Sequence, residues 1–248
     1  MTRILVPYHL DDHLPDLDVP YGPDHTVTME LPDGSPWQRM AALYERVAEV
    51  VADDTRVGGR PIVMSGDCTT SLGTVAGLQR AGIDPALVWF DGHGDVQTLE
   101  TTASGYLGGM PLRILTGYRP ELISDDLGLR PIPDDRVVLV DARDLDPPEA
   151  EFLTTSAVRH CEVDEVTADV LPEGALYLHI DFDVVAPDEL PGLLFPAAGG
   201  PGLGDVGAAI GRVVATGRVA AIGVGCTWHA GHGNAVRVRP YLDEARAA

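Results

Sequence analysis

Short hydrophobic runs of strand length recur along the chain. They occupy residues 4–6, 62–64, 87–90, 137–140, 176–180 and 219–224. Each run is hydrophobic at successive positions rather than at alternate ones, which is typical of strands buried on both faces of a parallel sheet. The pattern therefore predicts a buried, mostly parallel sheet.

Between these runs, hydrophobic residues recur at helical spacing. The clearest helix follows Ser35 and Pro36, an N-cap and a first-turn proline, and places Trp37, Met40, Ala41, Tyr44, Val47 and Val51 on one face. Residues 203–214 form a second such stripe, and weaker helices are predicted at 70–80 and 147–155. Alternating strands and helices predict a three-layer α/β/α fold, which we expect to form one domain over residues 1–248.

Three irregular stretches, at residues 8–34, 91–109 and 184–202, are too long for simple connections between a strand and a helix. Long loops in such folds commonly carry function. We therefore expect these stretches to contribute to a site.

The charge balance narrows the classes of partner. The chain has 38 acidic and 17 basic residues, a formal net charge of −21, and every basic residue is arginine. So negative a surface repels phosphate backbones, which excludes nucleic acid, but it suits cationic metals and cationic substrates. The missing lysine excludes Schiff-base chemistry and a P-loop.

The cysteines and the hydropathy indicate an intracellular protein. Cys68, Cys161 and Cys226 are far apart and form no paired motif, which argues against a disulfide framework. The first seven residues read as a strand rather than a signal peptide. No hydrophobic run approaches the roughly 18 residues of a membrane span. We expect a cytoplasmic protein with no membrane partner.

Potential metal ligands follow several of the predicted strands. The run 87–90 leads into D-G-H-G-D at residues 91–95, the run 176–180 into D-F-D at 181–183, and the run 62–64 into S-G-D-C at 65–68. Ligands bind beyond the carboxyl ends of parallel strands, and residues two apart in extended chain share a face. The candidate ligands are Cys68, Asp91, His93, Asp95, Asp181 and Asp183.

The carboxylates in these clusters need compensating charge. Four of them close together would repel one another and become partly protonated, and two bridged divalent ions would offset them. Oxygen-rich ligation with one imidazole suits manganese, and a metal pair can hold a bridging hydroxide as a nucleophile. For any one aspartate taken alone, a helix cap or a turn is the favoured interpretation. Five ligand-type residues in two clusters favour a binuclear centre.

The clusters resemble the two manganese signatures of the ureohydrolase family, which includes arginase, agmatinase and formimidoylglutamase. The loop after residue 183 contains proline and glycine residues in a pattern similar to that of the family. Residues 65–74 resemble the family's G-G-D-H-S segment. Together the likeness extends from about residue 60 to residue 225. It implies an α/β/α fold, two Mn²⁺ ions, hydrolysis of a carbon–nitrogen bond in a guanidine or amidine, and a homo-oligomer, trimeric or hexameric.

Cys68 occupies the position of a histidine ligand in the family. A thiolate is softer than an imidazole and would shift preference toward zinc, iron or cobalt. A helix N-terminus beside cations would favour that thiolate, although a small buried cysteine that does not touch the metal is an alternative. Within the family, this motif set is most similar to that of the hydroxyarginine amidinohydrolase of cycloserine biosynthesis, which releases hydroxyurea.

Further departures concern the proton donor and the substrate contacts. Arginases have a histidine proton shuttle where this chain has Gly108, and Tyr106 replaces a substrate-contacting asparagine, whereas Ser104 is retained. Gln97 is a further candidate for substrate contact. His179, where arginases have serine, is either a structural strand histidine or a residue that supports the metal ligands from behind.

The last predicted strand also departs from the family. Residues 222–229 contain no carboxylate, whereas the family has a glutamate there that holds the guanidinium. Trp228 is a candidate to stack on a planar cation, and His229 and His232 are candidates to supply the missing proton. A core tryptophan and two histidines in a solvated loop are the alternative.

We therefore expect a dinuclear metal hydrolase that acts on a small guanidine, hydroxyguanidine or amidine through a metal-bridging hydroxide, with Asp95 holding the nucleophile. One alternative is a non-catalytic protein of the same fold that retains its metal site. Another is an amide hydrolase with a single zinc ion, which would need fewer carboxylates.

Overall fold

A parallel sheet of eight strands forms the centre of the structure, a computed structural model that describes residues 1–247. The strand order is β4-β1-β5-β10-β9-β6-β7-β8, and every neighbouring pair is parallel. The strands are β1 (Arg3–Val6), β4 (His25–Thr26), β5 (Ile62–Ser65), β6 (Ala86–His93), β7 (Val137–Asp144), β8 (Arg159–Cys161), β9 (Leu176–Asp181) and β10 (Val219–Gly225). All six hydrophobic runs lie in strands, so the predicted sheet is confirmed.

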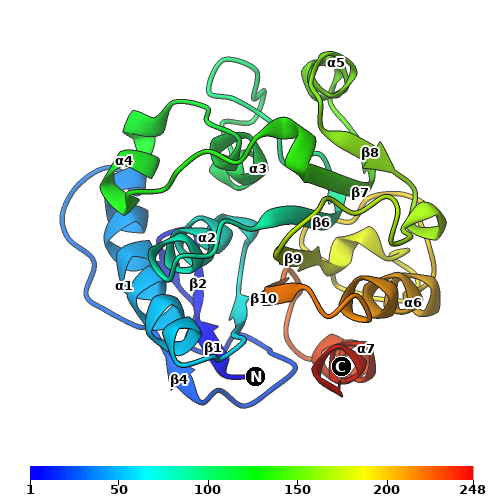
Figure 1. Cartoon of the computed structure of the whole chain (residues 1–248), viewed down its shortest axis with the longest axis horizontal. Coiled ribbons are helices and arrows are strands. Elements are labelled where there is room, and N and C mark those ends of the chain that lie inside the picture. Colours follow the sequence, from blue (N-terminus) through cyan, green and yellow to red (C-terminus); the bar gives the residue numbers. More distant parts are fainter. Residues whose placement is uncertain (248) are drawn as a thin grey trace.

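Helices cover both faces of this sheet and make the three predicted layers (Figure 1). One face carries α1 (Pro36–Arg56), α2 (Ser71–Arg80), α3 (Pro111–Leu115) and α4 (Ser124–Leu127), and the other carries α6 (Leu203–Val214) and α7 (Asn234–Ala247). Helix α5 (Pro147–Thr155) lies near the β8 edge. The sheet separates two hydrophobic cores, the first on the side of α1 and the second on the side of α6. Strand β6 contributes to both, because Trp89 packs into the first core and Phe90 into the second.

Local sequence explains the longest helix. Ser35 and Gln38 form a reciprocal capping box at the start of α1, and Pro36 occupies its first turn. The hydrophobic stripe that begins at Trp37 is buried against the first core. The helix continues to Arg56, one turn past the last predicted hydrophobic position.

Several short elements were not predicted. Strands β2 (Tyr8–His9) and β3 (Asp12–His13) form an antiparallel pair inside the stretch 8–34. The short 3₁₀ helices are η1 (Cys68–Thr70), η2 (Leu107–Gly109), η3 (Pro120–Leu122), η4 (Asp134–Arg136), η5 (Val163–Glu165) and η6 (Phe182–Val184). Elements of two to five residues have too few positions to show a period. Helix α7 is longer, but it carries Pro240 and only a weak hydrophobic stripe.

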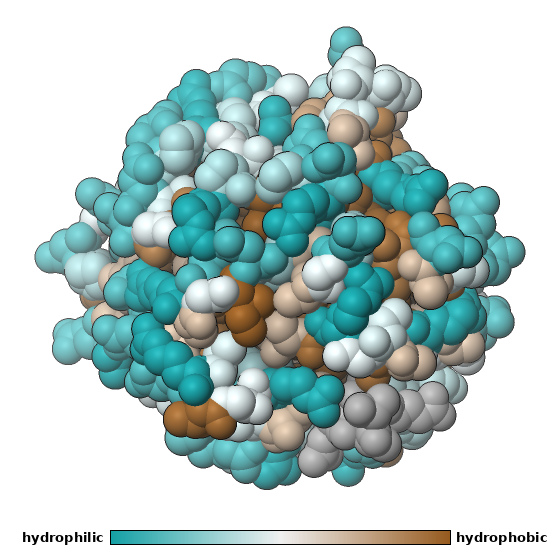
Figure 2. Space-filling view, viewed as in Figure 1, coloured by the Kyte–Doolittle hydropathy of each residue, from teal (hydrophilic) through white to brown (hydrophobic). Residues whose placement is uncertain are grey.

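The strand order creates the place for a site. Strands β5 and β6 are consecutive in the large sheet's sequence order, yet β10 and β9 lie between them. The winding of the chain therefore reverses here, which opens a crevice at the carboxyl ends of the central strands. None of the helices described within residues 1–247 combines the length and hydrophobicity needed to cross a bilayer. The face seen in Figure 2 is mainly hydrophilic, with hydrophobic residues in small groups.

Candidate metal centre

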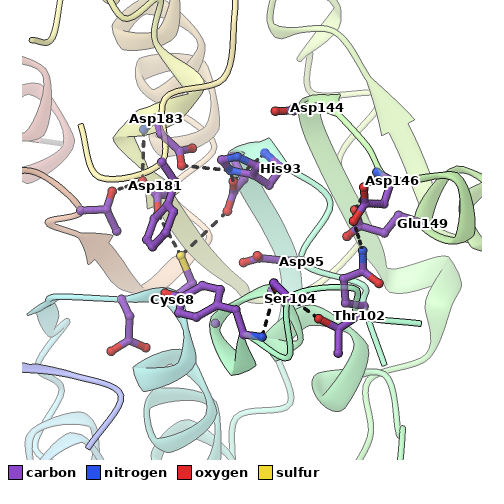
Figure 3. A pocket seen from close by; sticks show the side chains of 18 residues that line it. Cys68, His93, Asp95, Thr102, Ser104, Asp144, Asp146, Glu149, Asp181 and Asp183 are labelled. Carbon is purple, nitrogen blue, oxygen red and sulfur yellow. Dashed lines mark hydrogen bonds and ion pairs between the residues drawn. The ribbon is translucent and has the colours of Figure 1, made fainter. Parts of the chain in front are cut away.

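A cavity of about 250 Å³ opens at the carboxyl ends of the central strands (Figure 3). Strands β5, β6, β9 and β10 lead into it, together with the stretch 91–109 and Phe195 from the stretch 184–202. The lining residues are Asp67, Cys68, Asp91, His93, Asp95, Gln97, Thr102, Ser104, Tyr106, Gly108, Gly109, Asp144, Asp146, Glu149, Asp181, Asp183, Phe195 and Thr227. The cavity therefore contains all six side chains predicted as metal ligands.

One group of ligand atoms joins β6 to η6. His93 Nδ1 lies 3.0 Å from Oδ2 of Asp183 and 3.4 Å from Oδ1 of Asp91. These three side chains offer ligand atoms that all lie within 4.8 Å of one another. Gly92 makes this approach possible, because a Cβ at its position would lie 2.8 Å from the carbonyl oxygen of Asp183. Its amide also donates to Oδ1 of Asp183, at 2.9 Å.

A second group lies around Cys68 and shares Asp91. Cys68 Sγ is 3.0 Å from Oδ2 of Asp181 and 3.9 Å from Oδ2 of Asp91. Thr227 donates to the other oxygen of Asp181, at 2.6 Å, and orients that carboxylate. Cys68 and Asp91 have ligand atoms within 4.8 Å of a ring nitrogen of His179.

His179 is buried, and one of its nitrogens has no hydrogen-bond partner. The ring stacks on Trp89, with 3.8 Å between centroids, and Nδ1 lies 3.1 Å from the hydroxyl of Ser71. Nε2 is fully enclosed without a partner. Burial lowers the pKa of His179 to about 3, so the imidazole is neutral and one nitrogen keeps a free lone pair. A neutral, oriented imidazole is the form that binds metal.

Asp95 faces the cavity in a strained conformation. Its φ is +53°, a left-handed region that non-glycine residues rarely occupy, and Oδ2 is buried without a partner. In Figure 3 it lies near the centre of the pocket and carries no dashed contact. The backbone around it is held by Val96, whose amide donates to Glu149 at 3.3 Å, and by Arg113, whose amide donates to the Asp95 carbonyl at 3.2 Å.

The positive charge beside these four carboxylates is too small to offset their negative charge. Burial, and then the neighbouring carboxylate in each case, raises the pKa of Asp181 to about 7 and that of Asp183 to about 6. Burial also raises the pKa of Asp91 and of Asp95. Burial alone would lower the pKa of His93, but Asp183 and Asp91 outweigh it and raise that pKa to about 12.

Cys68 differs from expectation in its protonation. Burial raises the pKa of the thiol, and Asp181, Asp95 and Asp91 raise it further. We expected a helix N-terminus beside cations to favour the thiolate. Cys68 does begin η1, immediately before α2, but its neighbours are carboxylates rather than cations.

An acidic wall on the other side of the cavity was missed by the sequence interpretation. Asp144, Asp146 and Glu149 lie across the pocket from Cys68 and Asp181 (Figure 3). Asp146 and Glu149 form the capping box of α5. The signal was present, because these acids follow the hydrophobic run 137–140 just as the other clusters follow theirs.

Arg143 was also missed, and it fixes the loop that carries a ligand. Its guanidinium donates to the carbonyls of Asp183 (3.1 Å), Val184 (2.9 Å), Ala197 (3.0 Å) and Ala198 (3.1 Å). It also pairs with the buried carboxylate of Asp141. Arg143 therefore positions η6 and the segment around residue 197 relative to β7.

Some of the predicted substrate residues line the cavity and others do not. Gln97, Ser104 and Tyr106 line it, and Gln97 donates to Asp146 at 2.7 Å. The cavity lining contains neither Trp228 nor the two histidines predicted beside it. Trp228 packs edge-on against Phe182 and donates to Asp18 at 3.3 Å.

His229 and His232 lie away from the ligand groups. The amide of His229 donates to the carbonyl of Gly192 at 2.8 Å, and the ring of His232 lies against Gly192. Their roles as proton donors, and that of Trp228 as a stacking residue, stay predictions on which the function proposed below does not depend.

The donor set fits divalent metal ions. Two buried ligand atoms, Oδ2 of Asp95 and Nε2 of His179, have no bonding partner, and a cation would supply one. The buried carboxylates of Asp181 and Asp183 have raised pKa values, which a cation beside them would lower. Leaving such buried polar atoms unsatisfied costs on the order of 1–3 kcal/mol each. The mixture of oxygen, nitrogen and sulfur suits manganese in the His93 group and softer ions beside Cys68.

Comparison with known sequences identifies relatives. The arginase family profile matches residues 4–225. The chain is 33% identical over 158 residues to the N(omega)-hydroxy-L-arginine amidinohydrolase of Streptomyces lavendulae, covering 62% of this chain and 55% of that protein. It is 32% identical over 170 residues to an arginase of Brevibacillus brevis, covering 63% and 57%. The matches thus span little more than half of these relatives.

Solved structures show the same fold. Arginase from Bacillus caldovelox superposes with a TM-score of 0.85 at 21% identity, covering 100% of this chain and 99% of that chain. Formimidoylglutamase from Bacillus subtilis gives a TM-score of 0.72 at 14% identity, covering 98% and 85%. The predicted three-layer fold and the predicted family resemblance are both confirmed.

Proposed function

This chain belongs to the arginase family, and on that premise we propose that it hydrolyses a carbon–nitrogen bond in a small guanidino compound. The observation that carries the proposal is the pair of ligand groups that share Asp91 at the base of one cavity, with the unpartnered carboxylate of Asp95 beside them. A purely structural metal site would not need an open cavity or a free carboxylate.

We infer that the cavity holds two divalent ions. His93, Asp183 and Asp91 would hold one, and Cys68, His179 and Asp91 the other, with Asp181 and Asp95 completing the set. When bound, such ions polarise the substrate and lower the pKa of water toward neutrality. Manganese is the first candidate, and zinc, iron or cobalt suit the position beside Cys68.

Asp95 would act as the base that holds and deprotonates the attacking water. Its buried carboxylate has a raised pKa, which makes it a better proton acceptor than an exposed aspartate. Its backbone is left-handed, and its side chain lines the cavity. Water addition to the planar guanidino carbon would then precede release of the amine.

The acidic wall suits a substrate that carries a second positive charge. Asp144 and Asp146 line the cavity on the side opposite the proposed metal ligands. A substrate that reacts at the metal ions and also reaches these acids must extend across the cavity. A guanidine with an amino group at its far end matches this arrangement. We therefore propose arginine or a hydroxylated arginine as the substrate class, and the likeness to the hydroxyarginine enzyme supports the latter.

The test is turnover by metal-reconstituted protein. Protein loaded separately with Mn²⁺, Zn²⁺, Fe²⁺ and Co²⁺ would be offered arginine, hydroxyarginine, agmatine and formimidoylglutamate, with urea, hydroxyurea and amine products measured by mass spectrometry. We expect turnover of at least one guanidine, lost in Asp183→Asn and kept in Asp188→Asn, an exposed acid nearby. Metal-loaded, folded protein that turns over none of them would support the non-catalytic alternative instead.

A further inference from the structure

Tyr106 and His9 form a hydrogen-bonded pair at the cavity wall. Tyr106 Oη lies 3.0 Å from Nε2 of His9, and Nδ1 of His9 lies 2.8 Å from the carbonyl oxygen of Gly66. A carbonyl accepts only, so Nδ1 carries a proton, and Nε2 is the nitrogen that exchanges a proton with the phenol. The hydroxyl of Ser104 accepts from the amide of Tyr106 at 3.2 Å, which fixes the start of η2.

The pair connects two different spaces. Tyr106 lines the inner cavity with the metal-binding groups, whereas His9 lines a separate outer groove together with Asp12, Asp16 and Asp18. Phe195 borders both spaces, with its ring centroid 5.1 Å from that of Tyr106 and 6.2 Å from that of His9. The two side chains therefore lie at the boundary between the groove and the cavity.

Tyr106 can occupy its position only because residue 108 is a glycine and has no side chain. A Cβ at residue 108 would lie 2.3 Å from both Cζ and Oη of Tyr106. Any side chain at this position would displace the phenol from His9. The glycine and the tyrosine thus form one unit, in which the tyrosine hydroxyl stands where a side chain from residue 108 would otherwise project.

We propose that Tyr106 donates the proton to the leaving nitrogen and that His9 replaces that proton on the phenolic oxygen through Nε2. This inference rests on the proposed hydrolase function. Burial and the nearby Asp67 raise the pKa of Tyr106, so a phenolate would not persist in the cavity. An immediate proton source is therefore required, and His9 is bonded to the phenolic oxygen.

The step is balanced in atoms and charge. Asp95 takes one proton from the water as the water oxygen bonds to the guanidino carbon, and it releases that proton to solvent. It then takes the remaining hydroxyl proton as the carbonyl of the urea product forms. The carbon–nitrogen bond breaks, its electron pair stays on the leaving nitrogen, and that nitrogen takes the phenolic proton. Protonated His9 passes its Nε2 proton to the phenolic oxygen and regains a proton at the same nitrogen from water after the products leave, while Asp95 returns its second proton to solvent.

Two substrates that differ in the leaving group test this assignment. Canavanine is the oxyguanidine isostere of arginine, and its leaving nitrogen is far less basic, so it needs little help from an acid. We expect Tyr106→Phe to lower kcat for arginine by about 100-fold or more and for canavanine by less than about 10-fold, since general acids contribute ~10²–10⁴. Equal losses on both substrates, or none, would overturn the assignment.

His9→Gln should lower kcat for arginine with little change in KM. His13→Gln, the same change on the neighbouring strand, should leave both kcat and KM unchanged.

The ¹⁵N NMR spectrum of metal-free protein tests the hydrogen bond without any turnover. Tyr106→Phe should shift the resonance of His9 Nε2 and leave Nδ1 protonated. An unshifted Nε2 would overturn the pairing. Wild-type protein that hydrolyses no guanidine would instead overturn the proposed function, and this inference with it.

Discussion

The thiol of Cys68 donates to the carboxylate of Asp181 across 3.0 Å in the floor of the cavity. The sulfur thus stands among ligand oxygens, at a position where it either binds an ion directly or lies beside one. Because burial and the surrounding carboxylates raise the pKa of this thiol, binding of an ion by the sulfur must release a proton. Release of a proton when the metal binds therefore distinguishes a sulfur that is a ligand from one that only lies nearby.

Substitution of Cys68 tests direct ligation. In protein loaded with Co²⁺, a cysteine ligand gives an intense sulfur-to-metal absorption band near the ultraviolet. We expect this band in the wild type and its loss in Cys68→Ser, with Zn²⁺ affinity reduced about 10-fold or more because the softer donor is gone. Cys226→Ser, a buried cysteine that does not line the cavity, is the matched control. An unchanged spectrum in Cys68→Ser would show that the sulfur is only a neighbour.

Substitution of His179 tests whether this ring binds the same ion. His179→Ala removes the unpartnered nitrogen beside Cys68 and Asp91, so we expect about one fewer ion per chain by elemental analysis at limiting metal. His160→Ala, whose ring contacts only a backbone carbonyl at 2.6 Å among the described hydrogen bonds, should leave the count unchanged. Full metal content in His179→Ala would assign the ring a structural role, namely its stacking on Trp89.

Arg143 should be irreplaceable by lysine. A lysine keeps the charge beside Asp141 but cannot reach four separate carbonyls, so three partly buried acceptors and one exposed acceptor compete for fewer donors. We expect Arg143→Lys to lower the free energy of unfolding by about 2 kcal/mol or more, since each unsatisfied buried group costs about 1–3 kcal/mol. Urea denaturation measures this, with Arg46→Lys on the exposed face of α1 expected to change it by less than about 0.5 kcal/mol. Equal effects of the two variants would contradict the role given to Arg143.

The metal-free protein should lose stability as the pH rises from 6.5 to 8. Asp181 and Asp183 have pKa values of about 7 and about 6 in the fold, above the ordinary 3.8, and His93 has one of about 12, above 6.5. The folded protein therefore holds more protons than the unfolded chain in this range, and its unfolding free energy falls with pH. His179, whose pKa is lowered from 6.5 to about 3, acts in the opposite direction, and its contribution fades as the pH rises above 6.5.

Thermal unfolding of metal-free protein at the two pH values checks this sign. A loss of about 1 kcal/mol corresponds to a fall of about 2–4 °C in Tm for a protein of this size. Saturating Mn²⁺ should raise Tm more at pH 8 than at pH 6.5. At the higher pH the buried carboxylates have lost their protons, and the bound cations then supply the positive charge that offsets them. A metal-free Tm that rises over this interval would contradict the charge balance described for the cavity.

The sequence was sufficient to predict the sheet, the main helices and the gathering of the candidate metal ligands in one cavity. Buried parallel strands appear as unbroken hydrophobic runs, and ligands that follow such runs at a spacing of two converge whatever the loops do. Asp91 and His93 are the clearest case, since β6 continues through both and keeps them on one face. The four main helices were predicted for a related reason, because a stripe such as that of α1 has enough positions to define its period.

The remaining parts of the site depend on contacts that local sequence does not encode. His9 lies 97 residues from Tyr106, in a two-residue strand, and only the fold brings the two rings together. Arg143 acts on carbonyls about 40 to 55 residues away, so its sequence neighbours give no sign of its role. Trp228 stays a predicted stacking residue, and its ring packs edge-on against Phe182 and is not among the residues that line the cavity.

The central claim is that acidic side chains, His93 and the groups around Cys68 gather two metal ions in one cavity. Diffraction from metal-reconstituted crystals, recorded on both sides of the Mn absorption edge, counts and places the ions in a single measurement. The account predicts two anomalous peaks per chain, one within bonding distance of His93 and Asp183 and the other of Asp181 and the Cys68–His179 pair. One peak alone, or peaks bound only at the surface, would contradict it.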